Sequence, residues 1–324
     1  MTSGHCRNCR KLQPKSSSGS KNCITLIFFR YFCRNYLQMK NLILRAITGA
    51  VYVALICYSV LAGGWNYIIF FALITLLALH EFYNLCNSSN GGENITTLVI
   101  DIVGGIILCI GLGCVNMSLL SPFTTAVLGG TFFTVYLLYL IVRLVMQLYS
   151  QENSPLTKLA YSYMGQMYIA LPVGIMSMFY TFPNGKFLLL AMFIMIWLND
   201  TGAFCVGSLF GKHRLFPRIS PKKSWEGFAG GVIFAIASAF MFKYAFPQYF
   251  VSISLAGLCG LGAVVGAFAT WGDLVESLIK RTLGVKDSGT ILPGHGGILD
   301  RIDSLLLVVP ASVLYLTALI LYCC

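Results

Sequence analysis

Acidic side chains are scarce in this sequence and gather near its C-terminal end. Five of the 11 aspartates and glutamates lie between Asp273 and Asp303. Four polar residues in this segment have the i, i+3, i+4, i+7 spacing of one helix face: Asp273, Glu276, Ser277 and Lys280. Carboxylates at helix ends hold Mg²⁺ together with substrate phosphates, because this cation takes few protein oxygens and keeps several waters.

The loop that follows this helix face suits a polyphosphate. It contains six glycines and prolines: Gly284, Gly289, Pro293, Gly294, Gly296 and Gly297. Glycines let backbone N–H groups approach an anion. After the loop, Asp300 and Asp303 begin a second helix with i, i+3 spacing. Solvated helix caps would explain any one of these charges, but the whole group favours a phosphate site within residues 271–303.

The rest of the chain predicts the structure that positions this site. Of the 324 residues, 57% are hydrophobic and 10% charged, against about 25% charged in soluble proteins, which excludes a soluble enzyme. We expect an all-α, polytopic integral membrane protein with about nine transmembrane helices. The expected spans lie near residues 47–62, 65–79, 98–119, 123–142, 159–180, 186–206, 228–246, 250–270 and 304–322.

The distribution of basic residues orients these spans. With a cytoplasmic N-terminus, 13 of the 15 basic residues from Met39 onward fall on the cytoplasmic side, as the positive-inside rule requires. The net charge of +11 therefore needs no nucleic acid partner. We expect residues 1–38 to be a basic, non-catalytic extension. Residues 39–324 are expected to form the membrane-embedded catalytic domain, in a bacterial inner membrane.

A second polar group interrupts the sixth predicted span. Asn199 and Asp200 stand in an apolar helix, where a charged residue is costly and should face a partner or a wet cavity. The segment S-P-K-K-S-W-E-G then begins at Ser220 and brings Lys222 and Lys223 to the same predicted side of the membrane.

The stretch from Ser277 to Asp303, S-L-I-K-R-T-L-G-V-K-D-S-G-T-I-L-P-G-H-G-G-I-L-D-R-I-D, resembles the signature of the phosphatidate cytidylyltransferases, also called CDP-diacylglycerol synthases. The W-x-N-D-T-x-A stretch at Trp197 and the S-P-K-K-S-W-E-G stretch are similar to further elements of that family. The resemblance covers Met39 to the C-terminus. It implies that CTP and phosphatidic acid react, with Mg²⁺ at the lipid boundary, to give CDP-diacylglycerol and pyrophosphate.

The resemblance also implies roles for individual residues. The implied metal ligands are Asp273 and Asp300, with Asp303 as support. The implied catalytic residues are Asp273, Lys280, Arg281, Asp300 and Arg301. The implied substrate-binding residues are Asn199, Asp200, Ser220, Lys222, Lys223, Ser277, Lys286 and His295.

The sequence leaves the role of His295, a second cation and the oligomeric state open. His295 either contacts a phosphate or holds the glycine-rich turn. A second cation beside Mg²⁺ and a homodimer are both left open by the sequence.

Two other classes of protein compete with this interpretation. A proton-coupled transporter would use intramembrane acids such as Asp101 and Asp200, but the charges cluster at one end of the spans and not at the midplane. A CTP-dependent polyprenol kinase would use the same nucleotide and release CDP. The D-G-x-x-A-R pattern of CDP-alcohol phosphotransferases is absent from the sequence.

Overall fold

The computed structural model describes residues 46–88, 95–117, 121–150, 154–285, 288–289 and 296–323. The chain divides into two compact units, Met1–Ile47 and Thr48–Cys324. All of the described functional residues lie in the second unit.

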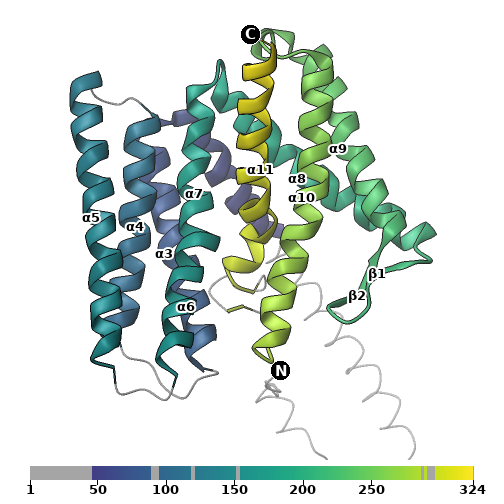
Figure 1. The fold of residues 1–324 in the computed structure, drawn as a ribbon. Helices are drawn as coiled ribbons and strands as arrows, with labels where there is room; N and C mark the ends of the chain where they lie inside the picture. Colours follow the sequence, from purple (N-terminus) through teal and green to yellow (C-terminus); the bar gives the residue numbers. More distant parts are fainter. Residues whose placement is uncertain are drawn as a thin grey trace, which may run out of the picture. The chain divides into compact units, whose positions relative to one another are not determined.

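Long apolar helices build the second unit (Figure 1). Within the described ranges, seven helices are long and apolar enough to cross a bilayer, judged by length and composition. They are α3 (Gly64–Ser88), α4 (Ile95–Asn116), α5 (Pro122–Leu148), α8 (Gly185–Phe210), α9 (Trp225–Ala245), α10 (Leu255–Thr282) and α11 (Leu299–Cys323). The predicted all-α, polytopic membrane fold is therefore confirmed.

The other two predicted spans correspond to one shorter helix and one interrupted helix. The first falls on the short apolar helix Ala46–Ala62. The fifth is a series of four pieces: α6 (Pro155–Gly165), the π-helix η1 (Gln166–Ala170), α7 (Leu171–Ile175) and the 3₁₀-helix η2 (Met176–Thr181). Pro172 lacks the N–H that a regular helix needs and its ring crowds the preceding turn, which explains the break. The count of nine spans and the cytoplasmic N-terminus stay predictions.

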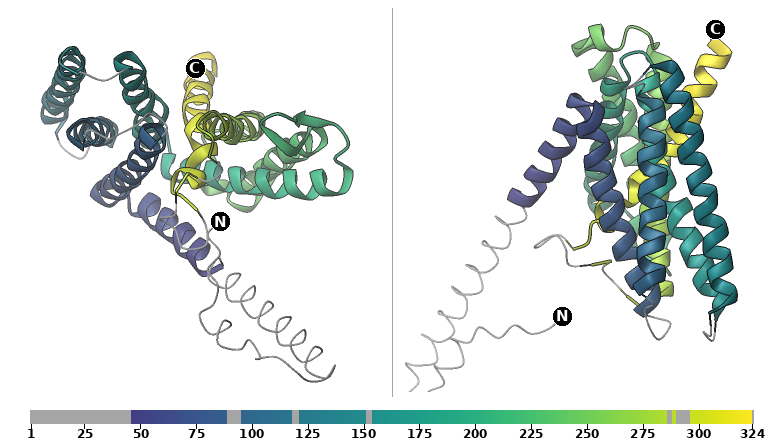
Figure 2. Two further views of the ribbon diagram at one scale, coloured as in Figure 1. Left: turned by 90° about the horizontal axis from the view of Figure 1, so that it is seen from below. Right: turned by 90° about the vertical axis from the view of Figure 1, so that its left-hand side faces the viewer.

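The helices form two groups with α11 between them. Seen end-on in Figure 2, α3 to α7 lie on one side and α8 to α10 on the other. Helix α11 packs against α10 and also against α7. Glycines allow close contacts within the second group: an added Cβ at Gly231 would lie 2.5 Å from Asn199 Oδ1, and one at Gly266 would lie 2.8 Å from Val232 Cα. Small residues at these contacts let the membrane helices approach closely.

A short β-hairpin joins α8 to α9. Its antiparallel strands are β1 (Arg214–Phe216) and β2 (Ser220–Ser224). Ser224 Oγ caps α9 by accepting from Gly227 N at 3.1 Å. The Glu226 carboxylate accepts from the backbone N–H of Lys212 and of His213, both at 3.2 Å, and so ties the hairpin to the first turn of α9. The sequence predicted a polar segment here but not a hairpin.

Candidate active site

Three carboxylates meet where α10 and α11 approach each other. One oxygen from each of Asp273, Glu276 and Asp303 lies within 4.8 Å of the others. We call these three residues the carboxylate cluster. Gly272 permits the approach, because an added Cβ there would lie 2.7 Å from the backbone oxygen of Asp303. The two acidic helix ends therefore converge, and Glu276 joins Asp273 and Asp303, which are two of the three ligands that the resemblance implies.

Asp300 lies beside the carboxylate cluster and is engaged by the protein. Lys280 Nζ is 2.6 Å from Asp300 Oδ1 and 2.6 Å from Glu276 Oε2. Asp300 Oδ2 accepts from the backbone N–H of Gly297 at 3.0 Å and of Ser288 at 3.2 Å. Asp300 thus holds the two described ends of the glycine-rich loop, and its metal-ligand role stays a prediction.

The end of α10 places Lys280 next to these acids. Gly284 has a φ of +73°, in the left-handed region that favours glycine. The N–H of Gly284 donates to Arg281 O at 3.2 Å and the N–H of Val285 donates to Lys280 O at 2.9 Å. These two bonds form a Schellman motif that ends the helix one turn beyond Ser277.

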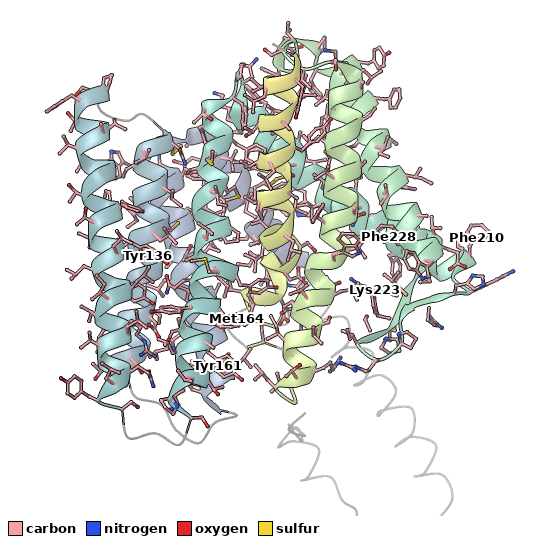
Figure 3. All side chains as sticks on the ribbon, viewed as in Figure 1. Tyr136, Tyr161, Met164, Phe210, Lys223 and Phe228 are labelled. Carbon is pink, nitrogen blue, oxygen red and sulfur yellow. The ribbon has the colours of Figure 1, made fainter. Side chains whose placement is uncertain are left out.

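The hairpin supplies a second lysine to the site. Lys223 Nζ lies 2.6 Å from Asp273 Oδ2 and 3.3 Å from Thr270 O, and Figure 3 shows Lys223 between the hairpin and α10. Ser277 Oγ donates to Asp273 Oδ1 at 3.3 Å. The structure therefore brings together the two polar groups that the sequence analysis treated as separate.

Two cavities adjoin the carboxylate cluster and share one residue. The hairpin cavity, of about 520 Å³, is lined by Asn199, Asp200, Arg214, Lys222, Lys223 and Asp273 among others. The α8–α11 cavity, of about 280 Å³, is lined by Tyr52, Trp197, Asp200, Asp300, Arg301 and Asp303 among others. Asp200 lines both cavities, so two ligands bound in them would meet next to the acids.

The remaining predicted site residues lie elsewhere or outside the described chain. Arg281 is exposed, and its Nη1 lies 3.4 Å from Val285 O on the same side of the helix end. Ser220 begins β2 and lines neither cavity. Lys286 and His295 lie outside the described residues.

Glu81 is a charged residue that the sequence analysis missed. It lies in α3, is 4% exposed, and its Oε2 accepts from Leu299 N at 2.9 Å and from Ser288 Oγ at 3.4 Å. A Cβ added to Gly289 or to Gly297 would come within 2.5 Å of its carboxylate. Glu81 therefore fixes the first turn of α11 and the glycines before it. A lone acid in an apolar run was the available signal, the same one that identified Asp200.

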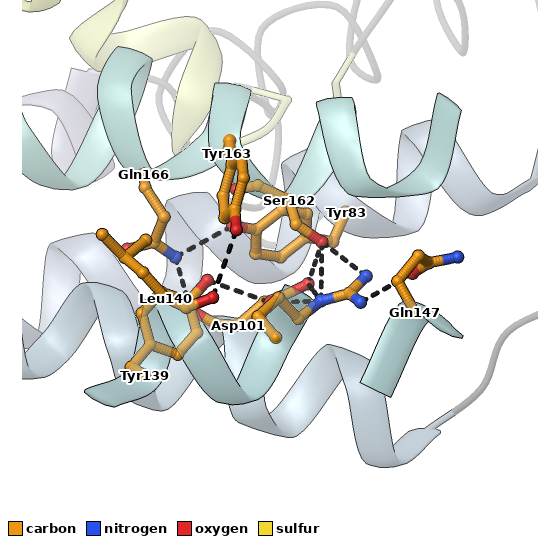
Figure 4. Close-up of polar contacts among 9 residues, drawn as sticks. Tyr83, Asp101, Tyr139, Leu140, Gln147, Ser162, Tyr163 and Gln166 are labelled. Atoms are coloured by element: carbon orange, nitrogen blue, oxygen red, sulfur yellow. Dashed lines mark hydrogen bonds and ion pairs between the residues drawn. The ribbon is translucent and has the colours of Figure 1, made fainter. Parts of the chain in front are cut away.

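Asp101, whose role the sequence left open, belongs to a buried polar network in the other group of helices (Figure 4). Arg143 Nε lies 3.0 Å from Asp101 Oδ1, and the Tyr139 hydroxyl donates to the same oxygen at 3.0 Å. Ser162 donates to Asp101 Oδ2, and Gln166 Nε2 donates to Asp101 O at 2.7 Å. The network joins α4, α5, α6 and η1, and it gives Asp101 a structural role.

The donor set around the carboxylate cluster fits a divalent cation. Carboxylate oxygens are the ligands that Mg²⁺ and similar hard cations prefer. Glu276 is 1% exposed, and its Oε1 has no hydrogen-bond partner among the described residues. The carboxylate cluster and Asp300 together make four acids, and the two lysines that pair with them are Lys223 and Lys280. A further positive charge would therefore relieve the repulsion between the carboxylates.

Acids and lysines around two adjoining cavities, at one end of a helical membrane bundle, define an enzyme that acts on phosphate compounds at the lipid boundary. Residues 43–319 match the model of the Cytidylyltransferase family, and the chain belongs to that family.

Named relatives come from bacteria. A phosphatidate cytidylyltransferase of Staphylococcus aureus is 32% identical over 267 residues, covering 82% of this chain and 95% of the relative. One from Staphylococcus haemolyticus is 34% identical over 270 residues, with the same coverage of both chains. One from Haemophilus influenzae is 48% identical over 128 residues, covering 39% of this chain and 44% of the relative. The family resemblance of the sequence motifs is confirmed.

Proposed function

We propose that the chain transfers the cytidylyl group of CTP to phosphatidic acid, giving CDP-diacylglycerol and pyrophosphate for phospholipid biosynthesis. The observation that carries this proposal is the carboxylate cluster between two adjoining cavities, at one end of a membrane-spanning bundle. Relatives whose match covers 82% of this chain are named phosphatidate cytidylyltransferases. A reaction between a membrane lipid and a soluble nucleotide needs a site of this kind.

Mg²⁺ is the cation that we assign to the carboxylate cluster. Asp273, Glu276 and Asp303 would hold it, and Asp300 would reach it only by leaving Lys280. When bound, the cation neutralises triphosphate oxygens and the charge of departing pyrophosphate. A second cation stays open.

The two cavities suit the two substrates differently. The hairpin cavity carries three basic residues, Arg214, Lys222 and Lys223, which match the several negative charges of a triphosphate. The α8–α11 cavity carries Arg301 beside aromatic walls from Tyr52 and Trp197, which suit a lipid with one phosphate. We therefore place CTP in the hairpin cavity and phosphatidic acid in the α8–α11 cavity.

In this arrangement the chain acts mainly by positioning its substrates. A phosphatidate oxygen, already anionic, attacks the α-phosphorus of CTP in line with the departing pyrophosphate. Lys223 and Lys280 hold the acids and balance charge near the phosphates. No protein base is needed, since the attacking oxygen carries no proton that must be removed.

We place the site on the cytoplasmic side of the inner membrane. The relatives are bacterial, and the basic loops expected on the cytoplasmic side include the hairpin and the segment after α10. A homodimer stays a prediction that the mass of the purified complex would test.

The position of the transferred label tests the proposed reaction against the kinase alternative. CTP labelled at the α-phosphate should leave its label in the lipid product, and CTP labelled at the γ-phosphate should release it as pyrophosphate. Label from the γ-phosphate in the lipid, with CDP released, would establish a kinase instead.

A further inference from the structure

The segment between α8 and α9 is strongly basic, and two of its basic residues lie outside both cavities of the site. Residues 212–224, which we call the basic hairpin, contain no acid and five lysines and arginines: Lys212, Arg214, Arg218, Lys222 and Lys223. Lys223 pairs with Asp273, and Arg214 Nη1 contacts Lys222 O at 3.4 Å. Lys212 and Arg218 are exposed, and neither has a side-chain partner in the part of the chain that the structure describes.

The basic hairpin lies at the ends of two membrane spans. Only Gly211 separates it from Phe210, the last residue of α8, and Trp225, the first residue of α9, follows it directly. Both aromatic side chains are exposed, by 64% and 54%, and so is Phe216 within the hairpin. Figure 3 shows Phe210 at the outer end of α8, next to the hairpin. Exposed aromatic side chains at the end of a span are typical of residues at the level of lipid headgroups.

The hairpin is also held in a fixed position relative to those spans. The Glu226 carboxylate accepts from the backbone N–H groups of Lys212 and His213, and its Oε1 also lies 2.6 Å from His213 Nδ1. These contacts fix the base of the hairpin to α9. The turn at residues 217–219 connects the strands at the far end. Unpaired cations on a fixed element beside exposed aromatic rings are complementary to an anionic lipid surface.

We propose that the basic hairpin binds anionic lipid headgroups at the membrane surface and thereby concentrates phosphatidic acid beside the site. Lys212 and Arg218 supply this attraction, while Phe210, Phe216 and Trp225 lie among the headgroups. The partner is the phosphate of a membrane lipid and not the nucleotide, because Lys212 and Arg218 line neither cavity. The inference rests on the proposed function, since it names how that reaction obtains its lipid.

The test uses the full-length protein in nanodiscs of phosphatidylcholine with a varied mole fraction of phosphatidic acid. One basic residue near an anionic surface contributes about 1 kcal/mol, or about a fivefold change in local lipid concentration. Arg218→Glu removes this positive charge and adds a negative one, so it should raise the apparent KM for phosphatidic acid at least about fivefold and leave kcat and the KM for CTP unchanged. The difference should shrink at high salt, because ions screen exposed charges.

Lys186→Glu is the matched control, since it makes the same change of charge at the opposite end of α8. It should leave the KM for phosphatidic acid at the wild-type value. A second measurement does not depend on activity: hydrogen exchange of residues 212–219 should be slower in nanodiscs that contain phosphatidic acid, and Arg218→Glu should abolish this protection.

The outcomes separate this inference from the proposed function. No turnover of phosphatidic acid by wild-type protein would contradict the proposed function itself. Normal turnover with an unchanged lipid KM in Arg218→Glu would overturn the inference and leave the hairpin as an ordinary basic loop. A raised KM for CTP in Arg218→Glu would overturn it too, because Arg218 would then act on the nucleotide and not on the lipid.

Discussion

Two groups of acids in this protein have opposite surroundings. Asp101 is buried between α4, α5 and α6, and both its carboxylate oxygens accept from Arg143 or from hydroxyl groups. In the carboxylate cluster, three acids converge within 4.8 Å and the buried Glu276 Oε1 lacks a partner among the described residues. A buried carboxylate whose oxygens all accept hydrogen bonds from the protein holds helices together. Like charges packed together without enough partners mark a place that a ligand completes.

We expect the largest effect on activity from a substitution in the carboxylate cluster. Glu276→Gln keeps the shape of the side chain and removes one of the three clustered charges. We expect the rate to fall about 10²- to 10³-fold, as when one group that stabilises developing charge is removed. The measurement is turnover per mole of folded protein, with thermal unfolding as the control. Wild-type activity in this variant would assign Glu276 to structure alone.

The buried ion pair should show the opposite pattern. Asp101→Asn leaves Arg143 buried without its counter-charge, and breaking a pair of this kind costs about 3–5 kcal/mol. Thermal unfolding in detergent should therefore occur at a clearly lower temperature. Turnover per folded molecule should stay within a few-fold of wild type. A stable but inactive Asp101→Asn protein would contradict the comparison and restore a functional role for Asp101.

Glu81 lies between these two cases, because it is structural in its contacts and adjacent to the site. Glu81→Gln keeps an acceptor for Leu299 N but weakens a charged hydrogen bond, a loss of about 1–2 kcal/mol. We expect kcat to fall about tenfold as the first turn of α11 loses its fixed position. The KM for CTP should change less. Equal losses in Glu81→Gln and Glu81→Ala would show that the charge, and not the hydrogen bond, is what matters.

The sequence predicted the fold from local patterns, and the same patterns named most of the residues that the structure brings together at the candidate site. Apolar runs identified the membrane helices, and helix spacing placed Asp273 beside Glu276 and Ser277. Such local patterns do not predict contacts between residues far apart in the sequence. Glu81 precedes its partner Leu299 by more than 200 residues, and nothing in helical periodicity determines whether Asp300 faces Lys280 or the carboxylate cluster.

We expect the smallest effect from a substitution of Arg281. The family pattern includes this residue, but in the structure it lies away from the carboxylate cluster. Arg281 is exposed and faces Val285 O rather than the carboxylate cluster. Arg281→Ala should change kcat and both KM values by about twofold at most, as expected for an exposed cation. Steady-state kinetics with both substrates checks this. A loss of a hundredfold would show that Arg281 turns toward the phosphates when substrates bind.

Release of pyrophosphate from purified protein, measured side by side for wild type, Asp303→Asn and Asp101→Asn, tests the role of the carboxylate cluster most directly. We predict that wild type and folded Asp101→Asn release pyrophosphate only when CTP, phosphatidic acid and Mg²⁺ are all present. Asp303→Asn should release none while unfolding at the wild-type temperature or above. Equal release by folded Asp303→Asn and wild type would contradict the central claim that the carboxylate cluster is the site of the reaction.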